Sequence, residues 1–409
     1  MLTRRTALIG TAALAATSRA YAQAGKSSAL PLIRIGMLQD ASGPYSFLAG
    51  RLSQECARQA IIELPDGAAF RAELISADHA NKPDVGMAIA RQWISEGVDA
   101  IMEFNNSAIA LAVNNLIRDT DKVMLGNNVG AAELSGKDCT PNMTHWTFDT
   151  AMLARTVGTA LAESGGDAWY FIRADYVFGR DLANDTAAVV KAHGGRIVGE
   201  SALPVGSTDY ASALLQAQSS GAKVVALALA GSDLLNCIKQ AGEFGLTSGP
   251  QKLAALVFYP QYAHSLGLNV AQGTNIAESF YWDLNDRTRA FAGRVMPRTS
   301  GMPPHMGAAG AYSAVRHYLK AVAALGPAQS KASGRAAVAK MKEIPVEDDV
   351  LSNASVRADG RVVSDVHLFE VKRPDESKGE WDVYKHRATL GPDKAWRPMS
   401  EGGCPLVRT

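Results

Sequence analysis

The chain has 409 residues, of which 47% are hydrophobic and 20% are charged, with 41 Lys and Arg against 40 Asp and Glu. This length suits two or three domains, and the apolar fraction is ample for sizeable cores, so a disordered or low-complexity chain is excluded. A formal charge of +1 gives no general attraction to nucleic acid or to anionic lipid.

Residues 1–22 have the pattern of an export signal. Arg4 and Arg5 form a charged start, an apolar run of about ten residues follows, and Ala20-Tyr21-Ala22 matches an A-x-A cleavage site. The apolar run is too short to span a membrane, which takes roughly 20 residues. We therefore predict cleavage after Ala22 and a mature protein in the periplasm. The paired arginines leave the twin-arginine route and the general secretion route both open.

Strand-like and helix-like segments alternate from residue 32 onward. In the first run, strands are predicted at 32–38, 70–77, 100–104 and 122–125, and helices at 48–64, 84–96 and 108–118. After a crossing segment at 144–148, a second run has helices at 151–163, 178–193, 210–218 and 233–244, with strands at 168–172, 196–201, 223–228 and 253–257. Such alternation is typical of parallel sheets that helices cover on both faces. We predict an α/β protein with two doubly wound, Rossmann-like lobes.

The remaining segments indicate that the chain recrosses between the lobes. A strand is predicted at 275–282, helices at 286–296, 305–325 and 335–342, and a closing antiparallel pair at 363–371 and 381–387. Leftover elements after two lobes favour a hinged clamshell. We predict a first lobe of residues 31–148 and 277–345 and a second lobe of residues 149–276 and 346–409.

The four cysteines show no CxxC pair and no Cys/His spacing of a zinc site. Cys56 and Cys237 lie in predicted helices, where a buried free thiol is expected. Cys139 and Cys404 lie in loop-like sequence. Because export places the protein in an oxidising compartment, we predict a disulfide between Cys139 and Cys404 that holds down the C-terminal tail.

Polar side chains follow two neighbouring strands of the first lobe. Asn105-Asn106-Ser107 opens the predicted helix at 108–118, and residues 126–130 (Gly-Asn-Asn-Val-Gly) follow the next strand. In open parallel sheets ligands bind outside the carboxyl ends of the strands, and the N–H groups at a helix start attract a carboxylate. The predicted ligand-binding residues here are Asn105, Asn106, Ser107, Asn128 and Gly130. Their commoner role as caps and turn residues stays open as the alternative.

Aromatic side chains follow other strands of both predicted lobes. We predict that they close over a ligand, with packing between the lobes as the alternative. The residues concerned are Tyr45, Phe47, Tyr176, Phe178 and Tyr259. Asp175 is the acid at these strand ends that we predict as the partner of a cationic ligand group, since Asp233 reads as a helix cap.

Motifs of catalysis are missing from the sequence. It contains no GxSxG, no HExxH, no Walker-type phosphate loop and no GxGxxG after a strand. The eight histidines are scattered, and His79 at a strand end has no nucleophile beside it in sequence. We predict a protein that is not an enzyme and that uses no cofactor and no metal.

Taken together, these segments resemble the type I periplasmic solute-binding proteins of ABC importers, in the class of the branched-chain amino acid (leucine-binding) receptors. The resemblance runs from about residue 31 to 390. It rests on residues 33–45 with their S-G-P turn, on Asp78 to Pro83, on 106–108 (Asn-Ser-Ala), on 174–179 (Ala-Asp-Tyr-Val-Phe-Gly), on 240–245 and on 310–314. It implies a clamshell with three crossovers, no catalytic activity, a small ligand in the cleft, a permease in the inner membrane as partner, and a monomer.

The resemblance also carries expectations for the ligand. In relatives that bind leucine-like amino acids, groups matching Asn105–Ser107 and Asn128–Gly130 hold the carboxylate, and an acid after the last strand of the second lobe holds the ammonium. This chain departs from that pattern, because residues 258–261 (Phe-Tyr-Pro-Gln) contain no acid. We therefore expect one of three kinds of ligand: an amino acid-like compound, an aromatic or apolar carboxylate, or a neutral amide. An alternative function is an exported ligand-sensing receptor that signals without transport.

Overall fold

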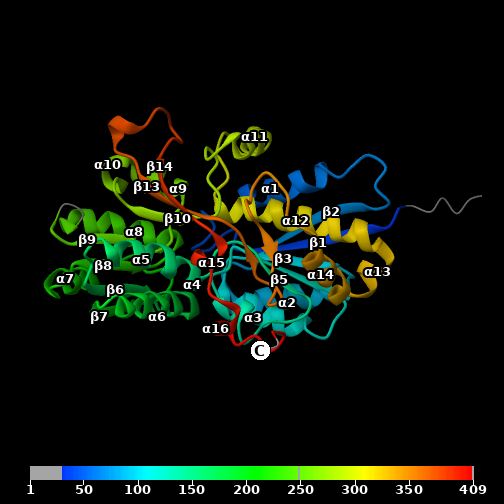
Figure 1. Cartoon of the computed structure of the whole chain (residues 1–409), viewed down its shortest axis with the longest axis horizontal. Coiled ribbons are helices and arrows are strands. Elements are labelled where there is room, and N and C mark those ends of the chain that lie inside the picture. The colour runs from blue at the N-terminus through cyan, green and yellow to red at the C-terminus, as the bar shows by residue number, and fades with distance from the viewer. Residues whose placement is uncertain (1–29, 247–248, 408–409) are drawn as a thin grey trace, which may run out of the picture.

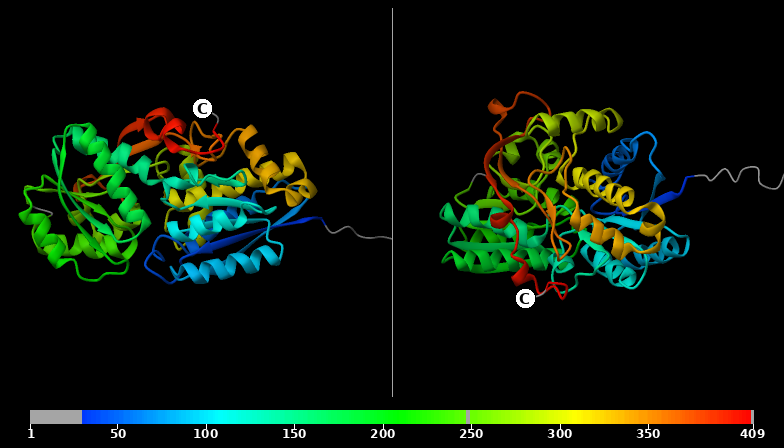
Figure 2. Two further views of the ribbon diagram at one scale, coloured as in Figure 1. Left: turned by 90° about the horizontal axis from the view of Figure 1, so that it is seen from below. Right: turned by 45° about the vertical axis from the view of Figure 1, so that its right-hand side comes forward.

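The computed structural model describes residues 30–246 and 249–407, which form two lobes set side by side (Figures 1 and 2). Each lobe is built on a parallel sheet with helices on both faces, which confirms the predicted α/β fold. The predicted signal peptide lies outside the described residues. None of the helices described combines the length and the apolar character that crossing a bilayer requires.

The first lobe has five parallel strands in the order β2-β1-β3-β4-β5. The strands are β1 (Leu32–Gln39), β2 (Arg71–Asp78), β3 (Ala100–Phe104), β4 (Val123–Asn127) and β5 (Met143–His145). One face packs against α1 (Arg51–Ile62), α11 (Asp286–Val295), α12 (Met306–Leu325) and α14 (Gly334–Glu343). The other face packs against α2 (Pro83–Ser95) and α3 (Ser107–Ile117). Every residue of β3 and β4 is buried, because helices cover both faces.

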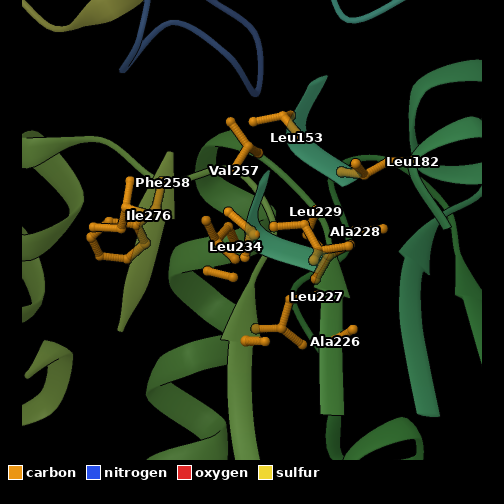
Figure 3. Packing of buried hydrophobic residues seen from close by; sticks show 14 of the residues in the cluster. Leu153, Leu182, Ala226, Leu227, Ala228, Leu229, Leu234, Val257, Phe258 and Ile276 are labelled. Carbon is orange, nitrogen blue, oxygen red and sulfur yellow. The ribbon is translucent and has the colours of Figure 1, made fainter. Parts of the chain in front are cut away.

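The second lobe has four parallel strands in the order β7-β6-β8-β9. They are β6 (Ala168–Ala174), β7 (Arg196–Leu203), β8 (Val224–Ala228) and β9 (Lys252–Ala255). The helices are α6 (Val177–Ala192), α7 (Ala211–Ser219), α8 (Gly231–Glu243), α9 (Pro260–Leu266) and α10 (Leu268–Ala271). The helix predicted at 151–163 is interrupted by a π-helical turn, η2 (Ala154–Gly158), between α4 (Thr150–Leu153) and α5 (Thr159–Glu163). Figure 3 shows the apolar packing around β8 and α8.

A small antiparallel sheet joins the second lobe, in the order β10-β13-β14. It consists of β10 (Asn275–Glu278), β13 (Val366–Val371) and β14 (Tyr384–Leu390). This confirms the predicted closing pair and adds the strand predicted at 275–282 to it. The remaining short elements are α13 (Pro327–Ala332), β11 (Ser355–Val356), β12 (Val362–Val363), α15 (Pro392–Ala395), α16 (Met399–Gly402) and the 3₁₀ turns η1 (Ala132–Ser135), η4 (Met296–Arg298) and η5 (Pro374–Glu376).

Core packing indicates where the chain changes lobe. Ile276 packs in the second-lobe core and Phe280 in the first-lobe core, close to the predicted boundary at 276/277. The segment from Val346 to Val362 also packs in the first-lobe core, whereas Val363 packs in the second. The predicted boundaries at 148/149 and 276/277 stay predictions, and we propose to move the last one from 345/346 to 362/363.

The C-terminal tail runs from the second lobe onto the first (Figure 1). Trp396 is buried in the second-lobe core and its Nε1 donates to the carbonyl of Ser364. Further on, Cys404 forms a disulfide with Cys139 at a Cα–Cα distance of 5.6 Å, which is the pairing that the sequence predicts. Cys56 and Cys237 are buried free thiols. The tail is therefore fixed to both lobes.

Candidate functional site

Loops after the strands of both parallel sheets meet around a small cavity between the lobes. Eight of the eleven predicted ligand residues line it, and so do four apolar residues that the sequence did not single out. The predicted lining residues are Tyr45, Asn105, Ser107, Asn128, Gly130, Tyr176, Phe178 and Tyr259. The additional ones are Leu48, Phe148, Ala230 and Val257. All four are apolar residues, and residue type alone does not distinguish a lining residue from a core residue.

The first-lobe wall begins where β3 ends and α3 starts. Asn106 is the N-cap of α3, since its Oδ1 accepts from the backbone N of Ile109 at 3.0 Å and its Nδ2 donates to Asn81 Oδ1 at 2.6 Å. Asn106 therefore caps the helix and does not line the cavity, which corrects the prediction. Its neighbours Asn105 and Ser107 do line it. The first N–H groups of α3 have no partner within the helix, so they favour an anion at this end.

The loop after β1 is shaped by one carboxylate. Asp40 is fully buried, and its two oxygens accept from the backbone N of Gly43 at 2.6 Å and of Tyr45 at 2.9 Å. The backbone N of Asp40 in turn donates to Asn105 Oδ1 at 3.1 Å. The S-G-P turn that begins at Ser42 is thereby folded against the end of β3, and it brings the Tyr45 ring to the cavity.

Asn128 connects the two lobes at the back of the cavity. Its Nδ2 lies 3.2 Å from Glu103 Oε1, and its Oδ1 accepts from the hydroxyl of Tyr259 at 3.3 Å. The ring of His305 stacks on Tyr259 at 4.4 Å between ring centroids. Burial lowers the pKa of His305 to about 4, so this ring is neutral at pH 7.

A buried carboxyl group lies beneath these asparagines. Glu103 is fully buried in β3 and accepts from the side-chain amides of Asn127 at 2.5 Å, Asn128 at 3.2 Å and Asn105 at 3.3 Å. Burial raises the pKa of Glu103, while the amide hydrogen bonds oppose that shift. The sequence does contain a signal for Glu103, because it is the one charged residue in the otherwise apolar strand 100–104.

The second-lobe wall consists mainly of aromatic rings. Tyr45 donates to the hydroxyl of Tyr176 across the cleft at 2.8 Å. Phe178 packs so closely on the first lobe that a Cβ at Gly130 would lie 2.4 Å from its ring. The backbone N of Ser232 donates to the carbonyl of Pro44 at 3.1 Å. With these contacts in place the lobes touch each other around the cavity, so the structure is a closed form.

Two more predicted residues do not reach the cavity. Phe47 is 38% exposed and packs on the ring of Tyr262, because the loop after Tyr45 turns outward. Asp175 has a 63% exposed side chain that pairs with Arg173 at 3.1 Å. The expected cationic partner of Asp175 is therefore an arginine of the same strand region and not a ligand group.

Metal-binding side chains and the histidine at the end of β2 complete the description of the strand ends. No cluster of three or more His, Cys, Asp and Glu residues there is arranged to hold a metal ion. His79 is fully buried, with its Nε2 donating to the carbonyl of Phe104 at 2.7 Å and its Nδ1 accepting from the backbone N of Asn81. Both ring nitrogens thus serve the loop structure.

Comparison with known proteins identifies the family. The periplasmic binding protein family matches residues 32–380, so the chain belongs to this family. A periplasmic binding protein from Burkholderia mallei is 38% identical, with 92% of this chain and 99% of that one covered and a TM-score of 0.87. A branched-chain amino acid ABC transporter periplasmic ligand-binding protein from Burkholderia xenovorans is 36% identical, with 91% and 99% covered and a TM-score of 0.80.

More distant structures share the fold alone. A solute-binding protein of an ABC transporter from R. palustris, in complex with benzoate, is 18% identical, with 89% and 97% covered and a TM-score of 0.77. The comparison with curated proteins gives no match. The chain is thus a periplasmic solute-binding protein of the ABC transporter class and not an enzyme. Cleavage after Ala22 and the export route stay predictions.

Proposed function

We propose that this periplasmic binding protein captures an aromatic or branched apolar carboxylate in the interlobe cleft and delivers it to a permease in the inner membrane. The observation that carries the proposal is the composition of the cavity wall. Five aromatic rings line it, and none of the described lining residues carries a charged side chain. A flat or branched apolar body fits such a wall, because it gains contact without leaving a buried charge unpaired.

The first-lobe wall supports the carboxylate end of this ligand. Ser107 opens α3, and the N–H groups of the first helical turn favour negative charge there. Asn105 and Ser107 add polar side chains at the same end of the cavity. A carboxylate held by N–H and O–H donors needs no lysine or arginine beside it.

The second-lobe wall argues against a free α-amino acid. A buried ammonium group needs an acid or several acceptors, and the residues after β9 supply the hydroxyl of Tyr259 instead of an acid. The nearby Gln261 does not line the cavity, and its Nε2 donates to the carbonyl of Pro303 at 2.8 Å. A neutral amide remains the second candidate ligand, because asparagine side chains can bind either carboxylate or amide groups.

Closure would make these polar contacts effective. The contacts between Tyr45 and Tyr176 and between Pro44 and Ser232 join the lobes around the cavity. A closed cleft excludes water, and hydrogen bonds are stronger in the resulting low-dielectric surroundings. A closed molecule also presents both lobes in a fixed arrangement, and we propose that the permease recognises this arrangement.

A thermal-shift panel tests the proposed ligand class with benzoate, benzamide and leucine. A single site filled at 100 times its dissociation constant adds about 2.7 kcal/mol to the free energy of unfolding. We expect benzoate to raise the melting temperature more than benzamide, and leucine to have little effect. A shift with leucine and none with benzoate would establish an amino acid receptor and refute the carboxylate proposal. Solution scattering with and without the stabilising compound then reports closure.

A further inference from the structure

The buried Glu103 has a hydrogen-bond arrangement that restricts its neighbours. An ionised carboxylate accepts hydrogen bonds and donates none, so each of its amide partners must turn the Nδ2 end toward it. Asn105, Asn127 and Asn128 all do so. Among the described residues Glu103 has no lysine, arginine or histidine as an ion-pair partner, so three amides and the Ser53 hydroxyl compensate its burial.

The oxygen ends of the same amides are directed elsewhere. Asn105 Oδ1 accepts from the backbone N of Asp40, and Asn128 Oδ1 accepts from Tyr259. The second hydrogen of Asn128 Nδ2 points toward the carbonyl of Leu48 at 3.5 Å. Both N–H groups of Asn128 therefore point to acceptors within the protein. This leaves the side-chain oxygen Oδ1, next to the Tyr259 hydroxyl, as the group of this lining side chain that has acceptor capacity for a ligand.

The backbone around Glu103 is strained in a way that needs such support. Glu103, Phe104 and Asn105 have φ values of +80°, +93° and +52°, and Asn128 has +53°. Positive φ is costly for residues other than glycine and persists where the surroundings hold it in place. Three of these four residues carry the carboxylate and the two lining amides, so the strain and the hydrogen bonds belong to one local arrangement.

We propose that Glu103 is a positioning residue for ligand recognition. Its carboxylate fixes the amides of Asn105 and Asn128, so that Asn128 presents an acceptor oxygen and the cleft prefers a carboxylate that also carries a hydrogen-bond donor, such as a ring hydroxyl. This inference rests on the proposed function for the ligand class. The orientation of the amides by Glu103 can be tested without any ligand.

The ligand-free test follows the side-chain amide NMR signals of Asn105, Asn127 and Asn128 during an acid titration. The titratable groups that face Glu103 and its amides are Cys56 on α1, Tyr259 in the second lobe and His305 before α12. Burial raises the pKa of the first two and lowers that of His305 to about 4, so all three stay neutral from pH 8 to pH 5. Glu278 on β10 lies next to Tyr259 and burial raises its pKa too, so the titration is repeated in Glu278→Gln to remove its contribution. We expect the three amides to shift together in one step above the pH at which an exposed glutamate titrates. Glu103→Gln should abolish this step. Independent shifts, or a common step that survives in Glu103→Gln, would overturn the proposal.

The ligand test compares 4-hydroxybenzoate with benzoate in three variants. Glu103→Gln should weaken binding of 4-hydroxybenzoate at least tenfold and reduce its preference over benzoate, while Glu103→Asp, which keeps the charge, should recover part of both. The matched control is Asp348→Asn, another buried first-lobe carboxylate, which accepts from Ser313 and from the backbone of Val350 and does not line the cavity. Equal preference in Glu103→Gln and wild type would refute the assigned role. If neither compound binds the wild type, the aromatic part of the proposed ligand class is wrong, and the amide titration still decides the role of Glu103.

Discussion

The two walls of the cleft differ in how they are built. The first-lobe wall contains a helix start, oriented amides and a run of strained backbone over the buried Glu103. The second-lobe wall consists of rings and small apolar residues such as Ala230 and Val257. Polar recognition needs fixed geometry, whereas an apolar cover needs shape. We therefore expect the polar groups of the first lobe to determine which ligands bind. The rings of the second lobe should mainly determine how readily the cleft closes.

The largest expected effect concerns the disulfide that ties the first lobe to the tail. Replacing Cys139 and Cys404 by serine should lower the free energy of unfolding by about 2–5 kcal/mol. Because the bond lies away from the cavity-lining residues, ligand affinity should change little. Denaturant unfolding with and without ligand measures both. The unfolded, unreduced wild type should titrate two thiols, and four would show that the pair is not formed.

Removing one oriented amide should weaken the first-lobe wall directly. Asn128→Ala removes an acceptor for Tyr259, a donor to Glu103 and a polar side chain that lines the cavity. Loss of one hydrogen bond to the ligand costs about 1–3 kcal/mol, or a factor of roughly 5 to 150 in affinity. Isothermal titration with the stabilising compound measures the loss. Unchanged affinity in both Asn128→Ala and Asn105→Ala would show that the ligand lies elsewhere.

Adding one carbon at the contact between the walls should separate the effects of closure and recognition. A Cβ at Gly130 would lie 2.4 Å from the Phe178 ring, so Gly130→Ala should oppose closure by about 1–3 kcal/mol. Solution scattering should then show a more open molecule. The second change Phe178→Leu should restore closure. Gly293→Ala on α11 is the control, since a Cβ there meets nothing within 4 Å. A closed Gly130→Ala variant would contradict the assigned contact.

The smallest expected effect comes from an acid that lies outside the cleft. Burial and the neighbouring Glu133 of the first lobe raise the pKa of Asp181 on α6 to about 6, against an ordinary value near 4. The folded state thus binds more protons between these values, and stability falls as pH rises through this window. Asp181→Asn should raise the melting temperature at pH 8 by about 1–2 °C, since the side chain is 19% exposed and water screens part of the effect, and should have little effect at pH 4. An equal effect at both pH values would exclude this cause.

Much of the fold could be predicted because its signals are local. β3 and β4 are short apolar runs between amphipathic helices, and the asparagines lie at their carboxyl ends, where parallel sheets place ligands. The cavity residues Leu48 and Phe148 could not be predicted, because only tertiary packing separates a lining residue from a core residue. The prediction that Phe47 lines the cavity has a related weakness. Side chains in an irregular loop follow no helical or strand period, so the sequence does not indicate which way they point. The lobe to which residues Val346 to Val362 belong could not be predicted either. It depends on which hydrophobic core they pack into, and the sequence around them does not show this.

The disulfide also fixes an order of events. Cys404 follows Cys139 by 265 residues, and all strands of both parallel sheets and of the closing sheet precede it in the chain. During synthesis the N-terminal parts of a chain emerge and begin to fold first. The bond can therefore form only after the segments that supply all of these strands have been synthesised. We expect it to stabilise the folded clamshell and not to direct the first steps of its folding.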